Sequence, residues 1–125
     1  MMREGNGFRV WYAAWAPRPD HTICVAHSRE GIHWERERDG QPVEGLFPKR
    51  AYGPKVCWID GRYLMFFAGS KPRETLLFAA ISRDGFAWEM LGDGRAIIHP
   101  GAGSDFDVET TYHPAVLRIG RRLRV

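Results

Sequence analysis

Short apolar runs alternate with turn residues along the whole chain, and this pattern predicts an all-β fold. Residues 63–68 (YLMFFA) are apolar at every position. Such a run is typical of a strand in a sheet that is covered on both faces. The separators contain glycine, proline and aspartate, which permit or impose turn geometry. The 14 glycines and 8 prolines in 125 residues support the same prediction.

One unit occurs twice in the sequence. Residues 26–35 (AHSREGIHWE) and 80–89 (AISRDGFAWE) share Ser, Arg, an acid, Gly, Trp and Glu in register, and the offset from 34 to 88 is 54. Just upstream, the offset from 8 to 63 is 55. A further match, from 54 to 114, has an offset of 60, so the second unit carries about six extra residues within 98–111. A repeat of this extent indicates an array of similar supersecondary units.

Each unit is predicted to form four short strands, A to D. The ranges are 55–59 and 115–119 for strand A, 8–15 and 62–69 for B, 22–28 and 75–82 for C, and 33–38 and 87–91 for D. The strand order along the chain is therefore B-C-D, then A-B-C-D, then A. Four-stranded antiparallel units in series are the blades of a β-propeller.

We expect a single partial β-propeller domain over residues 1–125. Blade repeat one covers about 7–44, blade repeat two about 52–98, and the inner strand of a next blade about 113–125. Blade one has no predicted inner strand, and an unpaired inner edge leaves backbone groups unsatisfied. Either further blades belong to a longer protein, or identical chains form a homo-oligomer by strand exchange between their ends. A trimer with six blades is the favoured ring.

The turn Ser-x-(Asp/Glu)-Gly-x-x-Trp places an acid beside a hydroxyl, as a catalytic pair would. A structural role is favoured, because the turn occurs in both units and a catalytic residue is needed once. We expect the acid to accept backbone N–H bonds, the glycine to take a positive φ, and the tryptophan to pack between blades. The residues are Ser28, Glu30, Gly31 and Trp34 in the first unit and Ser82, Asp84, Gly85 and Trp88 in the second.

The succession Pro-x-Val, then DGRYLMFFAG (60–69), then AISRDGFAWE (80–89) resembles the blades of the five-bladed glycosidase propellers. That group contains arabinanases, xylosidases, levanases, invertases and mannoside phosphorylases, and the turn is similar to a shortened sialidase Asp-box. The resemblance covers nearly the whole chain and implies a glycosidase-like propeller with a carbohydrate ligand. In that group an Asp often stands just before the proline of strand A. Gly53 and His113 stand there in this chain, where the family's chemistry is expected.

The candidates for catalysis lie in the insertion, because a loop that leads into an inner strand opens on the axial face of a propeller. Glycoside hydrolysis normally uses two carboxyl groups. Asp107 as base or nucleophile and Glu109 as acid would share one face of an extended segment. The alternative is that these acids only order a polar loop. The predicted substrate-binding residues are Asp105, Tyr112 and His113, with Arg50 and Tyr52 on the equivalent rim of the other blade.

Trp15 and Trp58 either offer faces for sugar stacking or fill the gap between blades. Three functions follow from these observations: a glycoside hydrolase-like fragment that recognises carbohydrate, a two-blade lectin-like module that oligomerises into a closed ring, or a truncated protein without independent activity. Aryl glycoside turnover, glycan binding and a cooperative thermal melt would distinguish them.

Composition and charge exclude several other classes. The chain is 44% hydrophobic and 26% charged with a net charge of +3, and its one basic cluster, at 118–124, holds no aromatic residue for stacking on nucleic acid. Cys24 and Cys57 lie in apolar runs without partner ligands, so we expect buried free thiols and no metal. We find no cofactor motif, no signal peptide and no membrane span, and expect a cytoplasmic protein.

Overall fold

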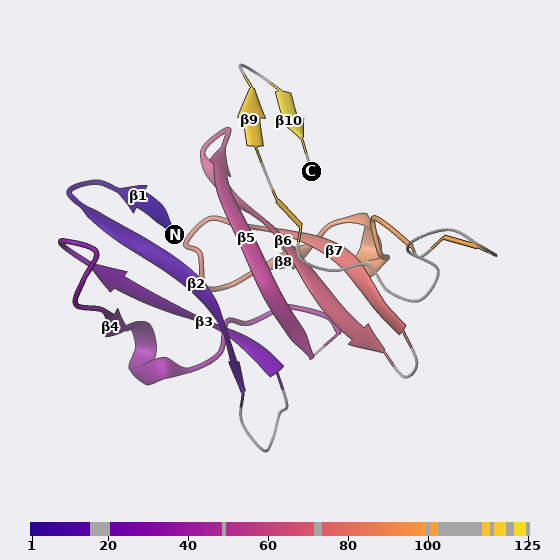
Figure 1. Ribbon diagram of the computed structural model, residues 1–125, viewed down its shortest axis with the longest axis horizontal. Coiled ribbons are helices and arrows are strands. Elements are labelled where there is room, and N and C mark those ends of the chain that lie inside the picture. The colour runs from indigo at the N-terminus through magenta and orange to yellow at the C-terminus, as the bar shows by residue number, and fades with distance from the viewer. Residues whose placement is uncertain are drawn as a thin grey trace.

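The structure, a computed structural model, describes residues 1–15, 21–48, 50–71, 74–99, 101–102, 114–115, 117–119 and 122–124. Its strands form two four-stranded antiparallel sheets and one two-stranded hairpin (Figure 1). The first sheet contains β1 (Met2–Glu4), β2 (Gly7–Trp15), β3 (His21–Ser28) and β4 (Glu35–Arg36); the second contains β5 (Ala51–Ile59), β6 (Arg62–Lys71), β7 (Glu74–Ser82) and β8 (Glu89–Met90). This confirms the all-β class and the two four-stranded blade repeats.

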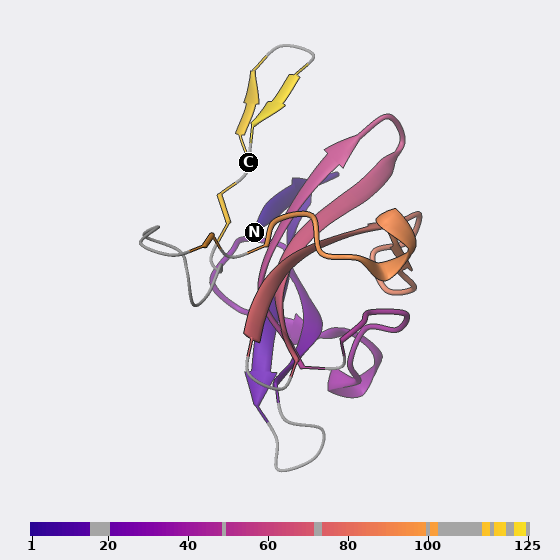
Figure 2. The ribbon, with the colours of Figure 1, turned by 90° about the vertical axis from the view of Figure 1, so that its right-hand side faces the viewer.

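The strands lie in each sheet in chain order, β1-β2-β3-β4 and β5-β6-β7-β8. Each sheet is followed by a short 3-10 turn, Glu37–Gly40 and Gly92–Gly94. The remaining strands, β9 (Leu117–Ile119) and β10 (Arg122–Arg124), pair with each other and lie beyond the upper ends of the sheets in Figures 1 and 2. No helix in the described residues is long and apolar enough to cross a membrane.

The first sheet has an inner strand that the sequence did not predict. Strand β1 pairs antiparallel with β2, with Met2 opposite Arg9 and Glu4 opposite Gly7. The β1–β2 hairpin matches the end of the β5–β6 hairpin, where Ile59 lies opposite Arg62. The strand escaped prediction because it has three residues, none fully buried, and so lacks an apolar run.

The outer strands are shorter than predicted, and the second inner strand is longer. Strands β4 and β8 have two residues each, because Arg38 (φ 47°) and Asp93 (φ 54°) turn the chain away from the sheet edge. Strand β5 begins at Ala51, before its proline. A register shift between Tyr52 and Lys55 accommodates Pro54, which has no N–H to donate to the ladder.

The main core lies between the two sheets. Trp11, Ile23 and Val25 of the first sheet pack with aromatic and aliphatic side chains of the second, namely Tyr63, Met65, Phe67, Leu76, Phe78, Phe86 and Trp88. A second, smaller cluster of Leu64, Phe66 and Ala79 lies on the opposite face of the second sheet. The runs that are apolar at every position are explained by this arrangement, because both faces of β6 and β7 are covered.

Residues 43–45 tie the first sheet to the second. Glu44 forms a parallel bridge with Ala87, with its N–H donating to the Phe86 carbonyl (3.0 Å) and its carbonyl accepting from the Trp88 N–H (2.9 Å). Gly45 has φ +84°, and a Cβ at that position would lie 1.9 Å from the Trp88 carbonyl oxygen. Only glycine fits this close approach of two backbones.

A buried arginine joins the two sheets through polar contacts. The Arg9 guanidinium donates to both carboxylate oxygens of Glu37 (2.7 and 2.6 Å) and to the Asp84 carbonyl of the second sheet (2.6 Å). It also lies 3.3 Å from the Tyr63 hydroxyl. Burial lowers the pKa of Arg9, but hydrogen bonding and the charge of Glu37 outweigh it, so that the pKa is raised. Arg9 is therefore held as a cation at the junction.

Two further side chains of the first sheet contact the turn of the second. The Trp11 indole donates to the Gly85 carbonyl (2.7 Å). The Arg38 guanidinium lies over the Phe86 ring, 3.8 Å from its centroid, and its nearest nitrogen is 4.0 Å from the Asp84 carboxylate. The junction therefore combines an apolar core with a polar rim.

Candidate functional site

The two Ser-x-(Asp/Glu)-Gly turns have the structural role that the sequence favours. Asp84 Oδ1 accepts from the backbone N–H groups of Phe86 (2.8 Å) and Ala87 (2.9 Å), and the Ser82 hydroxyl accepts from the Gly85 N–H (2.8 Å). The backbone bond from Phe86 is the main reason that the pKa of Asp84 lies below its ordinary value. Gly85 has φ +78°. An acid committed to its own turn in this way is not a catalytic group.

The corresponding turn of the first sheet is built alike. Glu30 accepts from the His33 N–H (2.7 Å), and the Ser28 hydroxyl accepts from the Gly31 N–H (2.8 Å). Gly31 has φ +85°. The tryptophans differ between the turns, since Trp88 is buried between the sheets and Trp34 is half-buried.

The site that the structure favours lies at the other ends of the strands. The end of β2, the start of β3, the start of β5, the end of β6 and the start of β7 lie on one side of the molecule, the lower side in Figure 1. In the strand ladders, Trp15 lies opposite His21 and Ser70 opposite Thr75. These strand ends share one rim of the molecule, which we call the axial rim.

Three hydroxyl groups form a cluster on the axial rim. The Tyr52 hydroxyl lies 3.0 Å from both the Ser70 and the Thr75 hydroxyl oxygens, which are 3.2 Å from each other. Each hydroxyl can both donate and accept, so the cluster can rearrange its bonds around an incoming hydroxyl.

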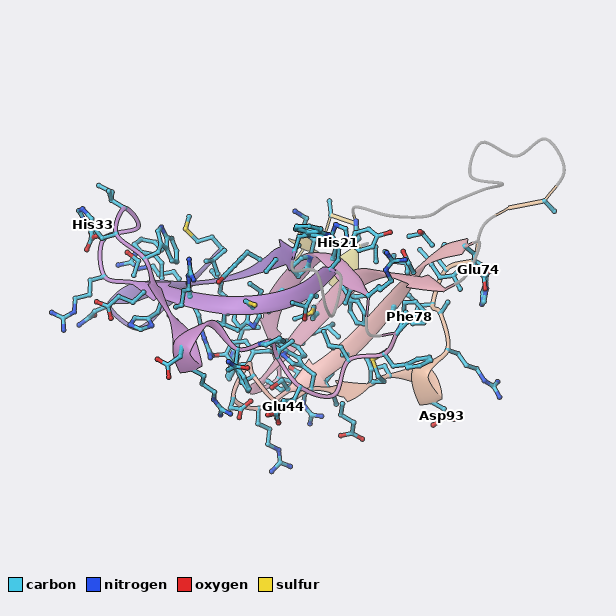
Figure 3. All side chains as sticks on the ribbon, turned by 90° about the horizontal axis from the view of Figure 1, so that it is seen from below. His21, His33, Glu44, Glu74, Phe78 and Asp93 are labelled. Atoms are coloured by element: carbon cyan, nitrogen blue, oxygen red, sulfur yellow. The ribbon has the colours of Figure 1, made fainter. Side chains whose placement is uncertain are left out.

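Aromatic side chains extend the cluster toward the first sheet. The His21 ring centroid lies 5.5 Å from that of Tyr52, with the planes tilted by 57°. Figure 3 labels His21 near the middle of the molecule and Glu74, at the start of β7, farther toward one end. Trp15, opposite His21 in the ladder, is 69% exposed. The axial rim thus offers an exposed indole, an imidazole and three hydroxyls from two sheets.

The structure separates the two tryptophans that the sequence offered as stacking faces. Trp58 lies toward the other end of β5 and packs edge-on against Tyr63, with ring centroids 4.7 Å apart. Trp15 belongs to the axial rim. Of the thiols, Cys24 is buried as predicted, whereas Cys57 is half-buried, and the two form no disulfide with each other.

The predicted site residues are only partly covered by the described structure. Tyr52 lies at the centre of the hydroxyl cluster, and the Arg50 carbonyl accepts from the Ser70 N–H (3.0 Å) beside it. The predicted catalytic residues Asp107 and Glu109, and the predicted binding residues Asp105, Tyr112 and His113, lie outside the described residues. Their roles stay predictions.

Three residues of the axial rim were not predicted from the sequence: His21, Ser70 and Thr75. Ser70 and Thr75 flank a strand-to-strand turn and meet only through the antiparallel register of β6 and β7. His21 reaches Tyr52 from the other sheet. A search for polar residues at equivalent strand ends of the repeat would have found these candidates.

The described part of the chain supplies binding groups more readily than catalytic ones. Glu74 is the one carboxylate among the described residues at the strand ends that form the axial rim. Among all described residues, no three or more His, Cys, Asp or Glu side chains gather to hold a metal ion. The arrangement can donate and accept hydrogen bonds and offer an aromatic face.

Comparisons with known proteins found relatives by sequence and by structure. The chain matches no protein-family model. Two curated proteins of Mycobacterium tuberculosis, "Uncharacterized protein Rv1502" of strain H37Rv and "Uncharacterized protein MT1551" of strain CDC 1551, are each 33% identical to it over 106 residues. The matches cover 78% of this chain and 34% of each relative. The chain therefore spans about a third of the length of these relatives.

Among solved structures, the GH32 beta-fructofuranosidase BmSUC1 of Bombyx mori superposes on the chain with a TM-score of 0.67. The alignment covers 98% of this chain and 26% of the enzyme, with 19% sequence identity. Identity this low establishes the fold alone. The two sheets of this chain therefore have a propeller-glycosidase-like fold, in agreement with the resemblance of the blade motifs.

Proposed function

We propose that the chain recognises carbohydrate at the axial rim, as part of a glycosidase-like propeller. The observation that carries this proposal is the Tyr52–Ser70–Thr75 hydroxyl cluster, with the His21 ring against Tyr52 and the exposed Trp15 opposite His21 in the strand ladder. A sugar ring has an apolar C–H face and a polar edge. An indole suits the first, and paired donors and acceptors suit the second.

The fold supports a saccharide rather than another hydroxylated ligand. The enzyme whose propeller superposes on this chain is named a beta-fructofuranosidase, and the motif resemblance points to a group that acts on arabinose, xylose, fructose and mannose polymers. The test panel should therefore contain oligosaccharides of these four sugars.

The proposal concerns binding. Glycoside hydrolysis normally requires two carboxyl groups that flank the scissile bond. The predicted pair, Asp107 and Glu109, lies outside the described residues. Release of p-nitrophenol from aryl glycosides, lost in both Asp107→Ala and Glu109→Ala, would add catalysis to the function.

Isothermal titration calorimetry on the four-sugar panel tests the proposal. For the saccharide that binds, Trp15→Ala should weaken affinity about tenfold, since loss of an aromatic contact of about 1.4 kcal/mol corresponds to that factor. Tyr52→Phe should weaken it about fivefold, because it removes one hydroxyl from the cluster.

Trp58→Ala is the matched control, since Trp58 is also a partly exposed strand tryptophan but lies away from the axial rim. It should leave affinity unchanged, with thermal melts confirming that all variants fold. Equal losses in Trp15→Ala and Trp58→Ala, or no binding to any saccharide, would refute the proposed site.

A further inference from the structure

The inner edge of the first sheet is paired along only part of its length. Strand β1 pairs with β2 no further than Met2, which lies opposite Arg9. In the second sheet, β5 pairs with the equivalent strand β6 as far as Ala51, which lies opposite Gly69. Among the described residues, no strand pairs with the β1 side of β2 beyond Arg9. Residues 10–15 therefore form an open strand edge.

Side chains on this part of β2 are less buried than their equivalents in the second sheet. At an offset of 55, Val10 corresponds to Met65 and Ala13 to Ala68. Met65 and Ala68 are each 0% exposed, whereas Val10 is half-buried and Ala13 is exposed. An edge with unpaired backbone donors and acceptors is a template for pairing with a further strand.

Two surface hollows flank the open edge at the point where β1 stops, and Val10 lines both. The larger, of about 670 Å³, is lined by Tyr12 and Trp34 among others, and we call it the aromatic hollow. The smaller, of about 410 Å³, is lined by Trp11 of β2 and Lys55 of β5 among others, and we call it the lysine hollow. Successive residues of a strand point to opposite faces, so an added strand would present its side chains to the two hollows in turn.

The charges around the edge indicate which kind of strand fits. Arg36 lines the aromatic hollow and Lys55 lines the lysine hollow, and no Asp or Glu of the described residues lines either one. Cationic surroundings favour an acidic partner. The chain's own β9–β10 hairpin contains Arg118, Arg122 and Arg124 and does not complement them. The occupant that the charges favour is therefore a strand of another polypeptide.

We infer that the edge of β2 from Trp11 to Trp15 binds an extended, acidic segment of another polypeptide as an added antiparallel strand. In the second sheet, Lys55 lies opposite Phe66, the equivalent of Trp11. The partner residue opposite Trp11 enters the lysine hollow, where an acidic side chain meets Lys55. The next partner residue, opposite Tyr12, covers the aromatic hollow. Backbone hydrogen bonds supply the affinity of such a strand, and the side-chain sites supply its specificity.

A pair of synthetic peptides tests the inference. The first has the sequence of Ala51–Ile59 (AYGPKVCWI), the strand that covers the equivalent edge in the second sheet. The second, the acidic peptide, carries the change Lys55→Glu at the position that the register brings opposite Trp11. The last residues of either peptide can displace β1, of which no residue is fully buried. Fluorescence anisotropy of the labelled peptides, in reducing buffer, should show the acidic peptide binding about threefold more tightly, because one exposed ion pair contributes about that factor.

The change Lys55→Glu in the chain itself should reverse this preference, and the fold should persist because Lys55 is exposed. Arg83→Glu is the matched control, since it makes the same change of charge at an exposed residue outside both hollows, and it should leave the preference in place.

The backbone contacts of the added strand are tested separately. N-methylation of the acidic peptide at alternate residues can be made in two phases. It should abolish binding in the phase whose N–H groups face β2 and spare it in the other. Amide hydrogen exchange at residues 11–15 should slow when the acidic peptide is bound.

Failure of both peptides to bind would overturn the inference, and so would a preference between them that Lys55→Glu leaves unchanged. Protection of residues 11–15 that rises with the concentration of the chain alone would overturn it as well, because a second copy would then cover the edge.

Discussion

The junction between the sheets gives a prediction with a magnitude. Arg9→Leu removes the cation that bonds both oxygens of Glu37, a pair whose side chains are 11% and 22% exposed. Removing one partner of a buried ion pair costs about 3–5 kcal/mol. Because Glu37 is still partly exposed, we expect the cost of breaking this pair to lie at the lower end of that range, at about 3 kcal/mol. The Asp84 carbonyl also loses its donor, which costs about 1 kcal/mol more.

The repeat itself supplies the compensating change. In the second sheet, Leu64 and Leu91 stand where the first has Arg9 and Glu37, and they pack together. The double variant Arg9→Leu/Glu37→Leu should therefore lose only about 1–2 kcal/mol, because no unpaired carboxylate remains. The coupling energy between the two positions should exceed about 2 kcal/mol, because the double variant loses about 2–3 kcal/mol less than Arg9→Leu and because Glu37→Leu alone is also destabilising, since it leaves the Arg9 cation unpaired.

Urea unfolding followed by tryptophan fluorescence measures all four corners of this cycle. A single Arg9→Leu variant as stable as the double variant would refute the reasoning, because the Glu37 carboxylate that the single variant leaves unpaired would then cost nothing. A double variant less stable than either single variant would refute it too, since the apolar pair would not fit the first sheet.

Two further perturbations test the construction of the junction and its turn. Gly45→Ala should destabilise the fold by about 3 kcal/mol or more, because the new Cβ meets the Trp88 carbonyl. Gly61→Ala, with φ +77° but open space around its Cβ position, should cost about 1 kcal/mol from backbone strain alone. Equal melting temperatures for the two variants would contradict this. Asp84 has a pKa below its ordinary 3.8, mainly through the Phe86 N–H, so it stabilises the fold above that pH and the stabilisation is lost as the pH falls through the folded-state pKa. The urea midpoint of Asp84→Asn should therefore lie below that of the unaltered chain at pH 6, and the gap should narrow as the pH falls below 3.8. A gap that is constant with pH would count against the assignment.

Much of the fold could be predicted from the sequence because the turn motifs of the two units occur at the same places in the repeat. Glycine and aspartate turns fixed most strand ends to within one or two residues. Strand β1 was missed because Met2–Glu4 carries no apolar run. The outer strands were overestimated because the chain takes a positive φ at residues 38 and 39 after β4 and at residues 92 and 93 after β8, and only one of these four residues, Gly92, is a glycine.

Less of the candidate site could be predicted, since it depends on contacts between distant residues. Tyr52 was predicted because it precedes the inner strand. Ser70 and Thr75 meet through the register of two strands, and His21 arrives from the neighbouring sheet. The role of the Ser-x-(Asp/Glu)-Gly turns, by contrast, could be predicted, because their recurrence in both units indicates a structural role.

The central claim, saccharide binding at the axial rim, is tested most directly by the indole N–H resonances of the five tryptophans in a ¹H–¹⁵N correlation spectrum. Arabino-, xylo-, fructo- and manno-oligosaccharides are titrated in turn. The account predicts that one of these sugars shifts the Trp15 indole resonance in a saturable way, while those of Trp11 and Trp88, buried between the sheets, stay in place. A saturable shift confined to Trp34 or Trp58, or no shift with any of the four sugars, would contradict it.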